Sequence, residues 1–216
     1  MNSLIKYIFI VIAIAGFVYC KNEPKSSEAV ANNAAAAPTQ SSGDISTLDA
    51  LDHDFNIIPD GSRLFIKGFF NNGLVDGAVT VNKGTLHVKQ GVITQASFDL
   101  DMKTIEQIVN RNDATVAFMK SDKVFNSDKY KSGKILITEC TKAVNDLQAT
   151  HVLKGSIVFR DKSVPFTAKA RVDYAKKNIS INAEELTMNA SDFGITMANP
   201  SQDHIYLRIS INGSLL

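Results

Sequence analysis

Strict alternation of apolar and polar residues dominates the chain from about residue 48 onward. The clearest case lies in residues 81–102, where a short alternating run precedes Gln90-Gly91 and a longer one follows. A period of two over this length predicts strands with one buried and one solvated face, and the polar-Gly pair predicts a hairpin turn. On the second strand we expect the buried face to carry Val92, Thr94, Ala96, Phe98, Leu100 and Met102.

Similar alternating segments follow one another with short turns between them. They cover residues 55–58, 63–70, 75–81, 134–141, 147–160, 164–174, 177–188 and 204–214. In residues 147–160 the expected apolar face begins at Leu147 and continues through Ala149 to Phe159. After Met102 the alternation stops, and residues 114–121 have the pattern of one or two helical turns. About eight strands without a βαβ rhythm predict an all-β, antiparallel barrel or sandwich and argue against a parallel α/β fold.

The first residues have the pattern of a secretory signal. Lys6 precedes an apolar run over residues 7–18 that is too short for a spanning helix, which needs about 20 apolar residues. Cys20 follows where a bacterial lipoprotein carries its acylated cysteine, although Phe17 and Tyr19 depart from the preferred residue types. We therefore expect residues 1–19 to be a signal peptide and Cys20 to be lipidated. Cleavage nearby without a lipid, or an uncleaved anchor, are the alternatives.

Residues 20–47 are rich in Ala, Ser, Asn and Pro and contain almost no large apolar side chains. Such a segment cannot bury enough surface to fold, so we expect a flexible tether of roughly 25–30 Å between its ends. The folded domain is expected over residues 48–216, in the cell envelope, periplasmic or anchored to a membrane through Cys20. The second cysteine, Cys140, then has no partner, so we expect a small buried residue and no disulfide.

Composition and motifs exclude several classes of function. The net charge of +1 over 216 residues gives no electrostatic reason to propose nucleic-acid binding. The four histidines are isolated from one another, and none has metal-ligand or catalytic spacing. His151 falls on the apolar register of its strand, where a hydrogen-bonded core histidine is the expected role. We therefore expect no catalytic residue, no metal, no cofactor and no enzymatic activity.

The expected interior mixes large and small side chains. Phe98, Phe159 and Phe166 are large, whereas Ala168 and Ala170 are small. An eight-stranded barrel is just wide enough to be filled by side chains or to hold one slender ligand. The mixture fits both alternatives: ordinary alternation of sizes in a filled core, or small residues that leave a channel open.

Several motifs occur in an order that resembles the YceI-like family of lipocalin-like barrels. They are Pro59-Asp-Gly-Ser-Arg-Leu64, Phe98-Asp-Leu-Asp-Met102, Met119-Lys-Ser121, Gly155-Ser-Ile-Val-Phe-Arg160 and Asp192-Phe-Gly-Ile195. The resemblance covers about residues 55–215, the whole folded domain. It implies an eight-stranded lipocalin-like barrel with a short helical excursion after the long central hairpin. Where the family commonly has an arginine two residues before the Asp-Phe-Gly motif, this chain has Ala190.

The resemblance also implies a ligand class: a long apolar chain such as a polyisoprenoid or the tail of an isoprenoid quinone. The partners are then an apolar lipid and, through Cys20, a membrane; a homodimer is compatible with this interpretation. The rival hypothesis is an envelope lipoprotein that acts as an interaction or structural module with a solid barrel core. From strand alternation and the family's packing, we expect the cavity wall to comprise Phe98, Leu100, Phe118, Phe125, Ile157, Phe159, Phe166, Ala168, Ala170 and Phe193.

Overall fold

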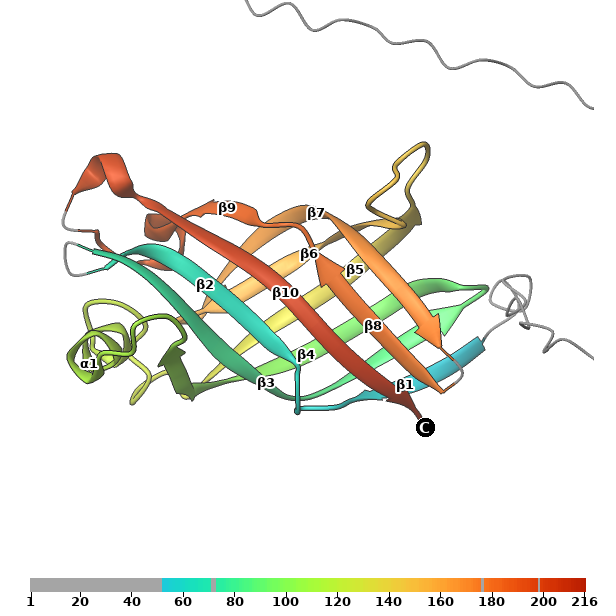
Figure 1. The fold of residues 1–216 in the computed structure, drawn as a ribbon, viewed down its shortest axis with the longest axis horizontal. Coiled ribbons are helices and arrows are strands. Elements are labelled where there is room, and N and C mark those ends of the chain that lie inside the picture. Colours follow the sequence, from blue (N-terminus) through green and yellow to red (C-terminus); the bar gives the residue numbers. More distant parts are fainter. Residues whose placement is uncertain (1–51, 71–72, 176, 198) are drawn as a thin grey trace, which may run out of the picture. The chain divides into compact units, whose positions relative to one another are not determined.

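The computed structural model describes residues 52–216, with gaps at residues 71–72, 176 and 198. This part of the chain forms ten β-strands, one α-helix and two short 3₁₀ helices (Figure 1). The strands are β1 (Asp52–Ile57), β2 (Arg63–Phe70), β3 (Gly73–Lys89), β4 (Val92–Gln107), β5 (Ser132–Lys142), β6 (His151–Phe159), β7 (Lys162–Ala175), β8 (Asn178–Ala183), β9 (Leu186–Asn189) and β10 (His204–Leu215). The helices are α1 (Asp113–Lys120), η2 (Ala190–Phe193) and η3 (Pro200–Gln202).

Eight strands close into one antiparallel ring in the order β10, β2, β3, β4, β5, β6, β7, β8. The pairing of β8 with β10 completes the ring and places Ile181 opposite Ile211. Of the two architectures that the alternation allowed, the protein therefore has the barrel. The expected all-β, eight-stranded barrel with a helix after the central hairpin is confirmed (Figure 1).

The last strand, β10, is the seam of the barrel. Its first half pairs with β9 on one side and with β2 on the other, so that Leu207 lies opposite both Leu186 and Ile66. Its second half pairs with β8 and β1, and Leu215 lies opposite Phe55. Each long side of β10 is thus covered by two shorter strands in succession, which leaves few of its backbone groups unpaired.

A buried serine ties the seam to the corner between β1 and β2. The side chain of Ser62 is fully buried. Its Oγ donates a hydrogen bond to the carbonyl of Ile58 (2.6 Å) and accepts one from the amide of Asn212 in β10 (2.9 Å). These bonds satisfy two backbone groups at a point where the strand ladder is interrupted.

Side-chain alternation along the strands builds the core, as β7 shows most clearly. Phe166, Ala168 and Ala170 point inward and are buried, while Thr167 and Lys169 between them are exposed. The turns are equally regular. Arg160 and Asp161 both have positive φ angles (49° and 60°), which is the geometry of a two-residue type I′ turn and matches the twist of the flanking strands.

One stretch of β4 departs from the expected alternation. Ile93 is buried and Thr94 is exposed, so the prediction that Thr94 lies on the apolar face is wrong; Val92 is half-buried and packs against the core. The register explains this: Val88 pairs with Ile93, but the preceding residue, His87, pairs with Gln95. Thr94 is therefore the extra residue of a β-bulge, and a bulge moves the following residues to the opposite face.

The predicted strand over residues 147–160 begins later than expected, at His151. Leu147, expected on its apolar face, is 99% exposed at the tip of the loop before β6. Asp146 gives this loop its shape, because its carboxylate accepts hydrogen bonds from the amides of Gln148 and Ala149 (both 2.9 Å) and pairs with Lys169 (2.9 Å). A side chain that binds its own loop amides stabilises a turn in place of the start of a strand.

The predicted helical turns near residues 114–121 are confirmed as α1. Asn112 caps the helix: its Oδ1 accepts hydrogen bonds from the amides of Ala114 (2.9 Å) and Thr115 (3.3 Å). Met119 is the helix residue that is buried in the core. Within the described ranges, no helix has the length and apolar character to cross a bilayer.

Candidate ligand-binding site at the barrel mouth

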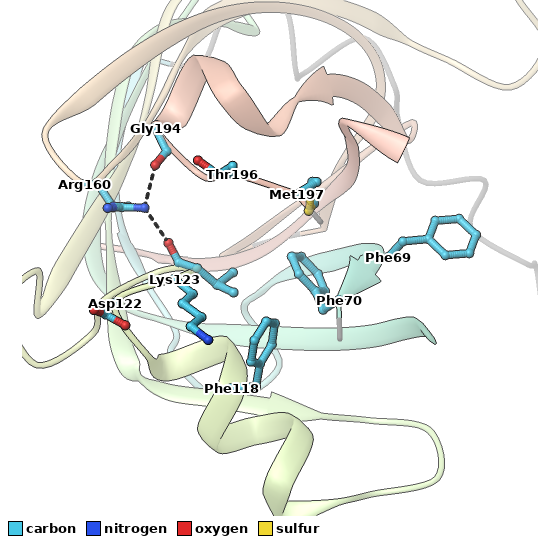
Figure 2. Close-up of a pocket in the computed structure, with 10 residues that line it drawn as sticks. Phe69, Phe70, Phe118, Asp122, Lys123, Arg160, Gly194, Thr196 and Met197 are labelled. Carbon is cyan, nitrogen blue, oxygen red and sulfur yellow. Dashed lines mark hydrogen bonds between the residues drawn. The ribbon is translucent and has the colours of Figure 1, made fainter. Parts of the chain in front are cut away.

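A pocket of about 600 Å³ opens at one end of the barrel (Figure 2). This is the end at which α1 lies in Figure 1. Four segments that are distant in the sequence form it: the end of β2, the end of α1 with the residues after it, the β6–β7 turn, and the loop that follows η2. The pocket is lined by Phe69, Phe70, Phe118, Asp122, Lys123, Val124, Arg160, Gly194, Thr196 and Met197.

The inner side of the pocket continues into a row of aromatic rings. Phe70 lines the pocket, and its ring lies 6.2 Å from that of Phe125. Phe125 lies 5.3 Å from Phe159, and Phe159 lies 5.1 Å from Phe193. All four side chains are at most 2% exposed, and their tilted geometries are those that aromatic pairs prefer. The rings therefore form a floor between the pocket and the deeper core.

Arg160 joins the two loops that frame the pocket. It occupies the type I′ turn between β6 and β7, which places its side chain at the mouth. Its Nη1 donates hydrogen bonds to the carbonyl of Val124 (3.0 Å) and to the carbonyl of Gly194 (2.6 Å), as Figure 2 shows. Gly194 ends η2 with a positive φ of 70°, a conformation that a residue without Cβ adopts at little cost.

The pocket has an apolar side and a polar side (Figure 2). Phe69, Phe70 and Phe118 stand on one side; Phe69 is 38% exposed and Phe118 is half-buried. Arg160 stands on the other, and Lys123 extends between them with its amine beside the ring of Phe118. In the part of the chain that the structure describes, no carboxylate forms an ion pair with either cation. Such a surface favours an amphiphilic molecule over a purely apolar or a purely polar one.

The structure brings four of the ten expected wall residues to this site. Phe118 lines the pocket, while Phe125, Phe159 and Phe193 belong to the aromatic floor. The other six are buried in the core away from the pocket lining: Phe98, Leu100, Ile157, Phe166, Ala168 and Ala170. The ten-residue cavity wall stays a prediction.

Sequence reasoning missed several residues of the pocket, chiefly Phe70, Phe69 and Arg160. Phe70 shares the register of Leu64 and Ile66 in an alternating strand, so that pattern could have identified it. Arg160 gave no such signal, because a charged residue in a short turn has the pattern of an ordinary solvated turn residue.

Polar side chains also gather at the opposite end of the barrel. His151 is buried, and its Nδ1 lies 2.9 Å from Thr150 Oγ1, as expected for a hydrogen-bonded core histidine. Burial, and then the charge of Lys142, lowers the pKa of His151. Burial raises the pKa of the Cys140 thiol to about 11, so this cysteine stays protonated and unreactive at neutral pH. Tyr174 donates a hydrogen bond to the carbonyl of Gly91 (3.3 Å).

These groups do not form a reactive centre. Over the described ranges, no three His, Cys, Asp or Glu side chains converge in a way that could hold a metal ion. The pocket at the mouth contains one carboxylate, Asp122, and no histidine or cysteine. The pocket is suited to binding a ligand, because it offers a shaped cavity, apolar side chains and two cations.

A closed antiparallel barrel with an apolar core and a pocket at one mouth places the protein in the lipocalin-like class of β-barrels. The sequence narrows this class to a family. The model of the YceI-like domain matches residues 55–214, which is most of the chain and nearly the whole barrel, and the protein belongs to this family. A comparison with curated proteins found no significant match.

Solved structures share the fold at low sequence identity. BcnA of Burkholderia cenocepacia superposes with a TM-score of 0.58 at 10% identity, covering 72% of this chain and 98% of its own. A polyisoprenoid-binding domain from Saccharophagus degradans gives 0.53 at 10% identity, covering 77% and 100%. A mutant YceI protein of Campylobacter jejuni gives 0.50 at 14% identity, covering 69% and 84%. At identities this low, the superpositions establish a common fold and nothing more.

Proposed function

We propose that this protein binds and carries a long apolar lipid chain, such as a polyisoprenoid or the tail of an isoprenoid quinone, and performs no chemistry on it. The observation that carries the proposal is the pocket at the barrel mouth, whose aromatic side leads directly to the buried phenylalanine floor. Membership of the YceI-like family and the likeness to a polyisoprenoid-binding domain support the same ligand class.

The size of the pocket is consistent with this proposal. Its volume of about 600 Å³ is within the range of pockets that bind small molecules. Each methylene that moves from water into an apolar site contributes about 0.8 kcal/mol, so ten buried methylenes contribute about 8 kcal/mol before the costs of association. A chain longer than the pocket would have to displace the rings of Phe125 and Phe159 to reach the deeper core.

The fully buried aromatic floor also favours a second candidate function. If those rings never move, the barrel is a solid core, and its outer surface or the N-terminal segment recognises a partner. Native mass spectrometry of protein purified without detergent separates the two. A co-purifying apolar molecule, or uptake of an added prenyl chain, supports carriage; protein that stays ligand-free in both experiments supports the solid barrel.

We further propose that the protein acts in the bacterial cell envelope, with residues 1–19 removed, Cys20 lipidated and residues 20–47 serving as a tether. These residues lie outside the described part of the chain, and the support is the sequence pattern alone. Intact mass measurement of the protein from membrane fractions is expected to show loss of 19 residues and addition of a lipid. A cytosolic protein that retains Met1 would refute this localisation.

A further inference from the structure

Arg160 has donor capacity at the pocket that the protein does not use. A guanidinium carries five N–H groups, and only Nη1 of Arg160 donates within the described structure, to the carbonyls of Val124 and Gly194. The N–H groups of Nε and Nη2 have no protein acceptor there. The residue is half-buried, and a partly buried cation interacts more strongly with an anion than one in bulk water does.

Lys123 adds a second cation to the lining of the pocket. The structure shows no carboxylate in an ion pair with its amine among the described residues, although Asp122 is adjacent in sequence and lines the same pocket. In Figure 2 the guanidinium of Arg160 lies across the pocket from the ring of Phe70, and the Lys123 side chain extends toward the ring of Phe118. Two cations and one carboxylate leave one positive charge at the pocket, which one anionic group would balance.

We propose that the ligand is an amphiphile with one anionic, oxygen-bearing head, a carboxylate or a phosphate. The head binds at Arg160 and Lys123, and the tail lies against Phe69, Phe70 and Phe118. This inference rests on the proposed function, because it specifies the polar end of the same apolar ligand. Arg160 then has a double role: Nη1 holds the two loops together, and its remaining donors face the ligand.

The test compares three ligands with the same 15-carbon isoprenoid tail: farnesol, farnesoic acid and farnesyl monophosphate. Affinities are measured by displacement of a fluorescent lipid from the full chain. A hydrogen bond to a charged group is worth about 1.5–3 kcal/mol, so the acid and the phosphate are expected to bind about 10- to 100-fold more tightly than the alcohol. The advantage is expected to shrink as salt is added. Comparison of acid with phosphate shows which head the pocket prefers.

Two variants locate the effect. Lys123→Gln is expected to reduce the preference for the acid over farnesol several-fold. Arg160→Lys keeps the charge but loses the planar set of guanidinium donors. It is expected to reduce the preference for the acid over farnesol more than Lys123→Gln does. Lys103→Gln removes an exposed charge outside the pocket lining and serves as the matched control. Thermal unfolding of each variant confirms that it is folded.

The outcomes are distinguishable. Equal affinity for all three ligands overturns the anionic head while the proposed apolar binding stands. A preference for the acid that persists unchanged in the double variant Lys123→Gln/Arg160→Gln, shown to be folded, also overturns it, because the anion is then bound elsewhere. If none of the three ligands binds, the proposed function fails and this inference fails with it.

Discussion

Replacement of Phe125 by alanine is the sharpest probe of the barrel mouth. The Phe125 side chain is fully buried and lies between two rings, with centroids 6.2 Å from Phe70 and 5.3 Å from Phe159. Truncation removes the ring and both contacts, and buried Phe→Ala changes cost about 3–5 kcal/mol. For a domain of this size each kcal/mol shifts the melting temperature by about 2–4 °C, so we expect a fall of about 6–20 °C.

Urea unfolding followed by far-ultraviolet circular dichroism measures the cost, since the chain has no tryptophan for fluorescence. The matched control is Phe69→Ala, because Phe69 lines the same pocket but is 38% exposed and has no ring contact with the floor among the described residues. We expect the control to cost less than about 1 kcal/mol. If Phe125→Ala costs no more than the control, the floor is not a packed structure and the reasoning about the pocket is wrong.

Three further substitutions test the fold around the site. Ser62→Ala removes the buried hydroxyl that bonds the amide of Asn212 and is expected to cost about 1–3 kcal/mol in urea unfolding. Asp146→Asn is expected to flatten the acid side of the stability profile: hydrogen bonds from the loop amides and then Lys169 lower the pKa of Asp146, so its contribution is complete above about pH 4 and is lost as the pH falls further. Gly155→Ala is expected to abolish folding or lower stability severely, because a Cβ there would lie 1.8 Å from the carbonyl oxygen of Leu136.

Two of these substitutions have a matched control variant, and the third has a clear refuting outcome. Ser163→Ala, at an exposed position of β7, is expected to be neutral, and an equal loss at Ser62 and Ser163 would contradict the role of the buried hydroxyl. If the wild type and Asp146→Asn lose stability equally between pH 4 and pH 2, the loop bonds of Asp146 do not stabilise the fold. At Gly73 a Cβ would meet no heavy atom of the described residues closer than 4.0 Å, its chain neighbours aside, so Gly73→Ala is expected to fold normally where Gly155→Ala does not.

The barrel could be predicted from the sequence because a strand buried on one face has apolar residues at every second position. β7 alternates without interruption from Phe166 to Val172, and β2 does so from Leu64 to Phe70. What the pattern could not show is a change of face within a strand. The bulge at Thr94 depends on how β4 pairs with β3, and one strand's own residues do not contain that register.

Local side-chain bonds account for the other errors. In the sequence Leu147 continues the apolar alternation of β6. In the structure Asp146 accepts hydrogen bonds from the loop amides, and the chain turns before β6 begins. The candidate site was only partly predictable for a related reason. Phe118 and the phenylalanines of the floor are large apolar residues that sequence patterns single out, whereas Arg160 acquires its role only when two distant loops meet at its turn.

The seam strand has a consequence for how the protein is made. β10 follows all the other described strands in the sequence, and the ring closes only when it pairs with β2 and β8. Until then, both of those strands present unpaired backbone edges, which are templates for association with other chains. The pairing of Leu64 with Ile209 spans nearly the whole domain, and contacts so distant in sequence slow folding. A chain that has not yet formed β10 therefore cannot close its barrel, and its exposed strand edges must be kept from aggregating until β10 pairs.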